Sequence, residues 1–435
     1  MRPSSSGSEG LFDGVLARGD VDVSDGAWLR ALLDVEGALA RACAKAGLVP
    51  DSAAARITEA CADVTAYDVG ALGRDAAAAG NPVVPLVRAL EQVAGPEAGP
   101  HVHRGATSQD VLDTAMVLLA RRAAVPMLAD LRAAAAAAAR LARAHRDDPL
   151  AGRTLGQQAV PTTFGLKAAG WLTGLDGAVS RVRATADSLP VQLGGAAGTL
   201  GAYDDAGLQV LAALAAGLGL PEPVLPWHAV RLPVADLAGA LGAAAGVVGK
   251  VALDVVLLAQ SEVGEVSEAS PGGSSAMPHK RNPVAAVSAR AAALRAPGLV
   301  ATLMGVMHQE HERAAGGWQA EWLAVADLLR VTGSAAAWLR VCLEGLQVHV
   351  DRMRANLGGS GLGSEALATA AAGSLGRARA HDMVRDALAG GDWPPELRAA
   401  LDGQDVDALL DPTRRTGSAG ALVDRALAAH ARARP

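Results

Sequence analysis

An apolar run from residue 234 to 260 constrains the fold more than any other feature of the chain. It reads VADLAGALGAAAGVVGKVALDVVLLAQ, and as a helix it is apolar nearly all round, so it needs neighbours on every side. Its length would also suit a membrane span. Asp236, Lys250 and Asp254 interrupt it, however, and charge at the middle of a bilayer is costly. We therefore expect a helix buried among other helices, and no membrane.

The rest of the chain also favours helices. Hydrophobic residues make up 51% of the 435 residues and aromatic residues only 3%, so alanine, leucine and valine carry the apolar share. Amphipathic or alanine-rich runs predict helices at about 24–47, 108–146, 164–186, 284–297 and 318–350. Strand-like alternation is nearly absent. The expected fold class is all-α, with long helices that need partners from other copies of the chain.

Glycine and proline divide these helices. Breaks at 80–82 and 95–96 leave short helical pieces near the N-terminus, and Pro126 should kink or split the helix it falls in. Residues 150–163 form a polar, turn-rich patch, and 358–363 marks a change to a less apolar tail.

Three parts are expected from these breaks. They are an N-terminal helical domain at 1–100, a central helix bundle at 101–350 and a small C-terminal helical domain at 351–435.

The charge and the cysteines exclude several kinds of partner. The net charge is −6, from 39 basic and 45 acidic residues with no basic block, so nucleic acid is not expected. Cys43, Cys61 and Cys342 are far apart, which argues against a disulfide framework or a zinc ribbon and favours a reducing cytoplasm. The first residues lack an apolar signal core.

Two histidine-rich stretches, 101–103 and 308–312, suggest metal ligands at first sight. Neither has a zinc spacing such as HExxH, so we expect no metal, although His103 is a candidate to line a pocket. The glycine-rich stretch at 194–201 lacks the GxxxxGK[ST] order and a preceding strand, so a nucleotide loop is not expected.

The most informative segment is the loop GGSSAMPHKRNP at 272–283. Consecutive glycines and serines can turn several backbone N–H groups toward one point and so bind an anion. Lys280 adds a positive charge, and Asn282 adds a donor and an acceptor. Such donors could also stabilise a serine alkoxide, without which a hydroxyl is too weak an acid to serve as a base. On composition alone, a surface linker is the commoner explanation.

Residues 273–282 resemble the complete GSSxMPxKxN signature of the fumarase/aspartase superfamily, and this favours the functional interpretation. GATSQD at 105–110 and the segment at 154–165 resemble two further blocks of that family. GNPVVPLV at 80–87 and QEHERAAGGWQAEW at 309–322 resemble its bacterial 3-carboxy-cis,cis-muconate cycloisomerases. The resemblance implies a three-domain helical fold and a homotetramer whose active sites are shared between subunits.

The resemblance also implies roles for the signature residues. Ser274 is expected to be the catalytic base. Lys280 and Asn282 are expected to bind the substrate carboxylate that becomes an aci-carboxylate dianion. No cofactor is implied, because the substrate's own carboxylate delocalises the carbanion.

Residues from the other blocks are expected to complete the pocket. Thr107 and Ser108 would bind a second carboxylate, and Gln157 and Asn81 would contact the substrate. The substrate would be a small di- or tricarboxylate.

Two departures from the family bear on the reaction. Relatives that eliminate amines have histidines where this chain has Leu155 and Asn81. An amine leaves poorly unless a general acid protonates it, whereas a carboxylate or nitrite leaves as a stable anion. The missing histidines therefore argue against adenylosuccinate-type elimination, and they suit lactone formation and the loss of nitrite from nitrosuccinate equally well. The resemblance implies a 3-carboxy-cis,cis-muconate cycloisomerase, with a lyase of a succinate derivative such as nitrosuccinate as the alternative and adenylosuccinate less favoured. A catalytically silent homologue would be expected to have a damaged signature, and this one is intact.

Overall fold

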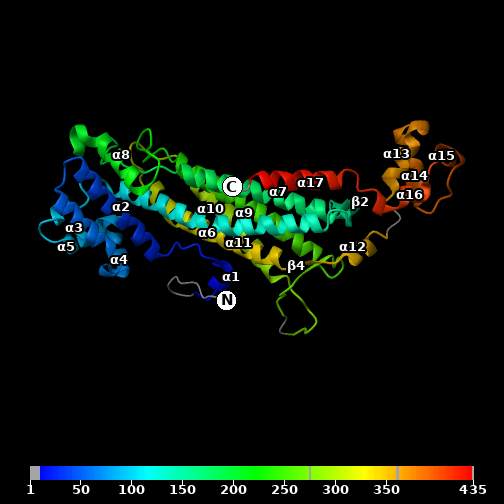
Figure 1. Ribbon diagram of the computed structural model, residues 1–435, viewed down its shortest axis with the longest axis horizontal. Coiled ribbons are helices and arrows are strands. Elements are labelled where there is room, and N and C mark those ends of the chain that lie inside the picture. The colour runs from blue at the N-terminus through cyan, green and yellow to red at the C-terminus, as the bar shows by residue number, and fades with distance from the viewer. Residues whose placement is uncertain (1–9, 274–275, 359–361, 434–435) are drawn as a thin grey trace. The chain divides into compact units, whose positions relative to one another are not determined.

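The computed structural model describes residues 10–273, 276–358 and 362–433 (Figure 1). These residues are mainly helical, which confirms the all-α fold class. The helices are α1 (Asp13–Leu16), α2 (Asp25–Lys45), α3 (Asp51–Ala62), α4 (Val69–Ala79), α5 (Val83–Ala94), α6 (Ser108–Ala144), α7 (Phe164–Ser188), α8 (Gly207–Leu218), α9 (Leu232–Leu258), α10 (Val284–Gly305), α11 (Gly317–Glu344), α12 (Val350–Asn356), α13 (Ser364–Leu375), α14 (Arg377–Leu388), α15 (Pro395–Ala400), α16 (Val406–Leu410) and α17 (Ala419–Ala433).

Four short strands form two antiparallel pairs. β1 (Pro149–Thr154) pairs with β2 (Gln157–Thr163), and β3 (Val266–Glu268) pairs with β4 (Leu346–Val348). The first pair occupies the segment that the sequence marks only as a polar, turn-rich patch. Its two-residue turn, Leu155–Gly156, has positive φ at both positions (52° and 77°), which is the backbone of a tight hairpin.

The chain divides into two compact units. Unit 1 comprises Met1–Leu131, Ala178–Gly249 and Ser288–Trp338, and unit 2 comprises Arg132–Gly177, Lys250–Val287 and Leu339–Pro435. The three-part division expected from the sequence stays a prediction.

Helix ends in unit 1 follow local chemistry. α2 begins after Ser24, whose Oγ accepts a hydrogen bond from the Ala27 N–H at 3.2 Å. α4 ends at Gly80 and α5 at Gly95, both at positive φ. α6 runs unbroken past Pro126, so the helix does not split there.

Helix α9 is buried over much of its surface, as its composition predicts. Ala238, Leu241, Ala245 and Val248 are each at most 1% exposed and recur at helical spacing. By length and hydropathy alone, α9 and α10 could each cross a membrane. Core helices of a soluble protein pass the same test, and the buried positions of α9 fit that explanation.

Unit 2 contains a small apolar cluster of its own, formed by α13, α14, α15 and α16. Leu367, Val384, Leu397 and Leu409 are buried at its centre. α17 packs elsewhere in this unit, where His430 Nδ1 lies 2.9 Å from Asp176 Oδ1 of α7.

Candidate functional site

The first block of unit 1 is organised around the carboxylate of Asp110. Thr107 directly precedes α6, and its N–H donates to Asp110 Oδ2 at 2.9 Å. The carboxylate of Asp110, in the first turn of α6, thus caps the backbone at the start of the helix, as the acid of a capping box does. Thr107 and Ser108 are half-buried at this helix start, whereas Asp110 is 1% exposed. The two predicted carboxylate-binding residues therefore lie on a backbone held by a buried acid.

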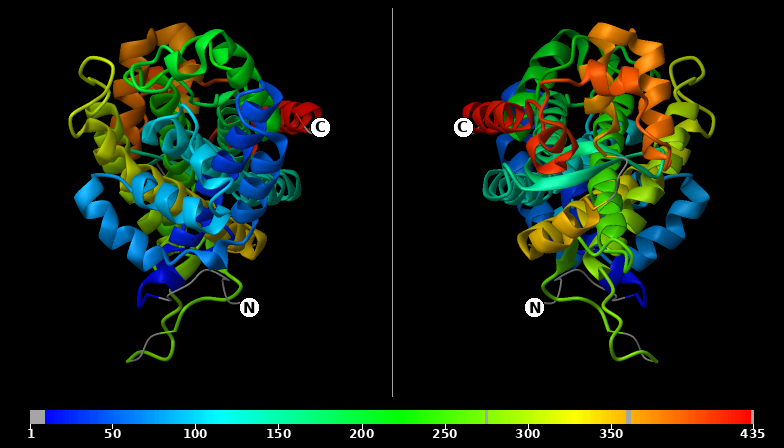
Figure 2. Two further views of the ribbon diagram at one scale, coloured as in Figure 1. Left: turned by 90° about the vertical axis from the view of Figure 1, so that its left-hand side faces the viewer. Right: turned by 90° about the vertical axis from the view of Figure 1, so that its right-hand side faces the viewer.

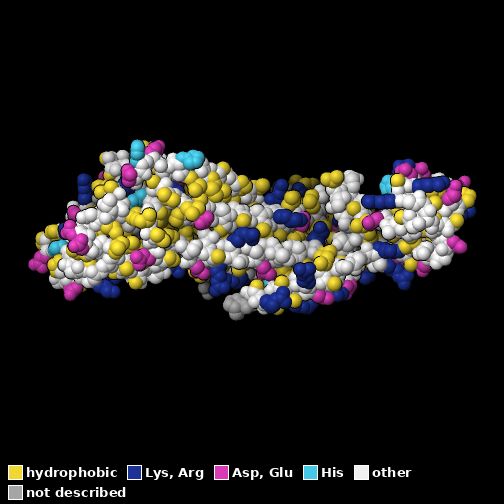
Figure 3. Space-filling model, turned by 90° about the horizontal axis from the view of Figure 1, so that it is seen from above, with side chains coloured by type: hydrophobic (Ala, Val, Ile, Leu, Met, Phe, Trp, Pro, Cys, Tyr) yellow, Lys and Arg dark blue, Asp and Glu magenta, His cyan; other side chains and the backbone are white. Residues whose placement is uncertain are grey.

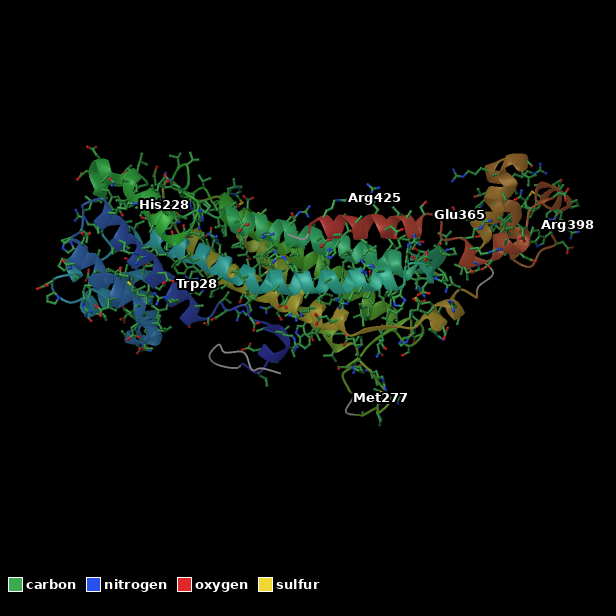
Figure 4. The ribbon with its side chains drawn as sticks, viewed as in Figure 1. Trp28, His228, Met277, Glu365, Arg398 and Arg425 are labelled. Carbon is green, nitrogen blue, oxygen red and sulfur yellow. The ribbon has the colours of Figure 1, made fainter. Side chains whose placement is uncertain are left out.

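Asp110 also ties this block to two distant segments of unit 1. Its Oδ1 accepts from Gly194 N–H at 2.9 Å, its Oδ2 accepts from Gly195 N–H at 2.9 Å, and His228 Nε2 lies 2.6 Å from Oδ1. A Cβ at Gly194 would lie 2.7 Å from His228 Cε1, so a side chain there would displace the imidazole that Figure 4 labels. The glycine-rich stretch thus serves close packing against the block.

A buried ionic cluster lies one helical turn further along α6. The Arg231 guanidinium donates to Asp113 Oδ2 at 2.7 Å and to Glu321 Oε2 at 2.6 Å. Trp318 Nε1 donates to Asp113 Oδ1 at 3.0 Å. Burial alone would lower the pKa of Arg231, but its two carboxylate partners raise it above the usual value, so Arg231 stays charged. Asp113, from the same block, therefore has a structural role.

Arg313 donates to three neutral acceptors within unit 1. Its guanidinium donates to Gln109 Oε1 at 3.1 Å and to the carbonyl oxygens of Gly195 and Ala196 at 3.0 and 2.7 Å. These neutral acceptors leave its positive charge without a carboxylate partner among the described residues.

His103 and Glu36 form a pair just before the first block. His103 has φ 55° and its Nδ1 lies 2.6 Å from Glu36 Oε1. Burial lowers the pKa of His103, but the charge of Glu36 and the hydrogen bond to it outweigh burial, so the pKa lies above its usual value. The sequence pointed to His103 as a pocket candidate, and the structure supplies its partner from α2.

In unit 2, the signature loop (residues 269–283) is anchored at both ends. β3 leads into it, and the Ala269 N–H donates to the Gly345 carbonyl at 2.9 Å. The Glu268 carboxylate accepts from the N–H groups of Ala285 and Ala286 at 3.1 and 2.8 Å, and so caps α10 where the loop ends. Figures 1 and 2 show the loop running outward from the helices of this unit.

Within the loop, Asn282 closes the base. Its N–H and carbonyl exchange hydrogen bonds with Gly272 at 2.9 Å each, and its Nδ2 donates to the Gly273 carbonyl at 3.3 Å. Lys280 is exposed, as is Met277, which Figure 4 labels near the outer part of the loop. Ser274, the predicted base, lies outside the described residues.

The remaining predicted residues have these positions. Gln157 is exposed at the start of β2, beside the hairpin turn in unit 2. Asn81 lies in unit 1, where its Oδ1 accepts from the Val83 N–H at 3.0 Å and so orients the start of α5. Asn81, Thr107 and Ser108 belong to unit 1, whereas Gln157, Lys280 and Asn282 belong to unit 2.

The side chains that sequence reasoning missed are long-range partners. Asp110 lies in the GATSQD block, whereas His228 lies outside the segments that the sequence singled out, and only the fold brings the two side chains together. Among the described residues, no group of three or more His, Cys, Asp or Glu could hold a metal ion. On the face that Figure 3 shows, acidic and basic side chains are interspersed with apolar ones.

The chain is similar to known proteins over most of its length. A family model described as Lyase matches residues 12–298. A nitrosuccinate lyase from Streptomyces davaonensis is 47% identical over 455 residues, covering 98% of this chain and 96% of its own. A 3-carboxy-cis,cis-muconate cycloisomerase from Pseudomonas aeruginosa is 46% identical over 428 residues, covering 94% and 93%. The crystal structure of 3-carboxy-cis,cis-muconate lactonizing enzyme from Pseudomonas putida matches with a TM-score of 0.89 at 41% identity, covering 98% of this chain and 100% of its own.

Proposed function

Since the chain belongs to the Lyase family of the fumarase/aspartase superfamily, we propose that it moves a proton next to a substrate carboxylate, with Ser274 as the base. The observation that carries this proposal is the intact signature on a loop anchored at both ends. Glu268 fixes one end to α10, and Asn282 closes the base against Gly272. Electrostatic stabilisation of an anion requires donors in a fixed arrangement, and the two anchored ends of the loop support this requirement.

The proposed chemistry divides between the loop residues. In the elimination direction, Ser274 takes the proton alpha to one carboxylate, and the electron pair moves into that carboxylate to form a dianion. Lys280 and Asn282 are proposed to stabilise the dianion. The exposure of Lys280, which has no ion pair among the described residues, supports its role, whereas Asn282 Nδ2 donates to the Gly273 carbonyl in this structure. The electron pair then forms the double bond and expels the leaving group.

Leu155 supports a leaving group that needs no protonation. It stands fully exposed at the tip of the β1–β2 hairpin, at the position where amine-eliminating relatives have a histidine. A leucine cannot donate a proton, so the leaving group is proposed to be an anion in its own right.

We propose 3-carboxy-cis,cis-muconate as the first substrate. An internal carboxylate adds to an alkene carbon to form the lactone C–O bond, and Ser274 delivers a proton to the carbon alpha to another carboxylate. The support is 46% identity to a cycloisomerase over 94% of this chain.

Nitrosuccinate is the second candidate substrate. Loss of the alpha proton and expulsion of nitrite would give fumarate, with the same base and the same dianion. A specific observation favours it, namely 47% identity to a nitrosuccinate lyase over 98% of this chain.

A substrate panel with product identification separates the two. The purified protein is incubated with 3-carboxy-cis,cis-muconate and with nitrosuccinate, and products are followed by absorbance and mass spectrometry. We expect lactone from the first. Fumarate and nitrite from the second, with no turnover of carboxymuconate, would overturn the cycloisomerase assignment and keep the serine chemistry.

A further inference from the structure

A cavity of about 590 Å³ lies in unit 1, lined by residues of α2, α3 and α6 and by the C-terminal end of α8. None of the predicted site residues lines it. All of its lining residues belong to unit 1. The cavity is therefore a feature separate from the first block and from the signature loop.

Three arginines and one aspartate supply the charged groups of its lining. Arg30 and Arg122 share Asp34, whose Oδ1 and Oδ2 lie 2.8 and 2.6 Å from the two guanidiniums. Arg41 has a neutral partner instead, because its Nη1 donates to Thr58 Oγ1 at 3.3 Å. The cavity thus carries an excess of positive charge, and Arg41 is the guanidinium whose charge the described residues leave without a carboxylate.

The donors of Arg30 are only partly satisfied. Its Nη1 and Nη2 donate to the carbonyls of Ala62 and Cys61 at 3.1 and 2.7 Å, so it also closes the C-terminal end of α3. Its Nε is buried and has no hydrogen-bond partner. Because this N–H is closed to solvent, a ligand in the cavity would meet Arg30 through its positive charge and not through Nε.

The other walls are apolar. Leu33, Leu118 and Leu218 line the cavity together with Gly37. Inorganic phosphate has no carbon skeleton to place against such walls, whereas an organic acid has both a hydrocarbon part and carboxylates. Planar guanidiniums also match carboxylates in two-point hydrogen bonds.

We propose that this cavity is a second ligand site, which binds a small organic polycarboxylate. Its carboxylates meet Arg41, Arg30 and Arg122 add positive charge to the cavity, and its carbon skeleton lies against the leucines. This proposal does not depend on the reaction proposed above.

Isothermal titration calorimetry with tricarballylate, a saturated tricarboxylate, tests the proposal. The wild-type protein is expected to bind two equivalents per chain, one at the candidate active site and one in this cavity. Arg41→Met removes the unpaired guanidinium and is expected to weaken one of the two classes by about tenfold or more. The KM for the substrate should stay unchanged.

The matched control is Arg74→Met, which removes an exposed arginine from α4 of the same unit and should keep both classes. An Arg41→Met variant that keeps every tricarballylate class of the wild-type protein unchanged would overturn the proposal, whether or not the candidate active site binds tricarballylate. Displacement of tricarballylate from this class by equimolar inorganic phosphate would refute the organic character of the ligand.

Discussion

Arg231 lies in the core of unit 1, where its fully buried guanidinium joins Asp113 and Glu321. Arg231→Met would leave two carboxylates buried together, and we expect it to destabilise the protein by about 3–5 kcal/mol. Urea denaturation followed by circular dichroism measures the loss. The control is Arg330→Met, which breaks a partly exposed pair with Asp327 and should cost about 0–1 kcal/mol. Equal losses in the two variants would contradict this account.

A pH dependence is expected from His103. Because its folded pKa lies above the ordinary value, its stabilisation is complete below the unfolded pKa of about 6.5 and is lost as the pH rises through the folded pKa. His103→Asn suits the positive φ of this position and removes the charge. The difference in melting temperature between wild type and variant should be largest at pH 5.5 and shrink toward pH 9. A difference between wild type and the His103 variant that grows with pH would refute the pairing of His103 with Glu36.

For single residues, the sequence indicates which side chains belong to a functional site, but it does not show which distant side chains contact each other. The signature motif identifies Lys280 and Asn282 as site residues, because each occupies a fixed position in a long motif. Asp110 and His228 are 118 positions apart, and no local pattern predicts that their side chains meet at 2.6 Å. The hydrogen bond by which Asn81 orients the start of α5 was not predicted, because the resemblance to the family implies only a substrate contact for this residue.

Glu268, the last residue of β3, accepts hydrogen bonds from the first turn of α10, where the signature loop ends. Glu268→Ala removes the acceptor for two α10 N–H groups, and we expect a loss of about 0.5–2 kcal/mol together with a fall in kcat. Hydrogen exchange at Ala285 and Ala286 should quicken. The matched control is Asp68→Ala, which removes the cap of α4 at similar cost in stability and should leave kcat unchanged. Equal effects on kcat would show that Glu268 acts on stability alone.

Helices were more predictable than the strands. Ser24, Gly80 and Gly95 mark helix ends by chemistry that acts within a few residues, and the structure places the ends there. The β1–β2 hairpin was not predicted, because its turn places Leu155 at positive φ, where glycine or asparagine is the usual signal. Proline at 126 was expected to kink or split α6, which remains one helix.

For the whole molecule, the central expectation is a homotetramer with shared sites. Ser274→Ala and Thr107→Val damage different blocks, so each homotetramer should be inactive. Co-expression of the two variants should restore about a quarter of wild-type activity if the blocks come from different subunits and assort at random. Size-exclusion chromatography with light scattering checks that mixed tetramers form. Mixed tetramers without recovered activity would place both residues in one subunit's site.

The all-α class of the whole molecule could be predicted because apolar helical runs dominate the chain. Its division into units could not, because each unit joins three segments that are far apart in the sequence. The identity of the substrate cannot be predicted from local sequence patterns either, because it depends on how side chains from separate blocks shape one pocket.

The most direct test of the serine-base proposal is turnover by Ser274→Ala on the substrate that the panel identifies. Loss of a general base should lower kcat by about 10²–10⁴-fold, with the melting temperature unchanged. Ser188→Ala, at an exposed serine that ends α7, should retain full activity. A Ser274→Ala protein that turns over at nearly the wild-type rate would contradict the proposed mechanism.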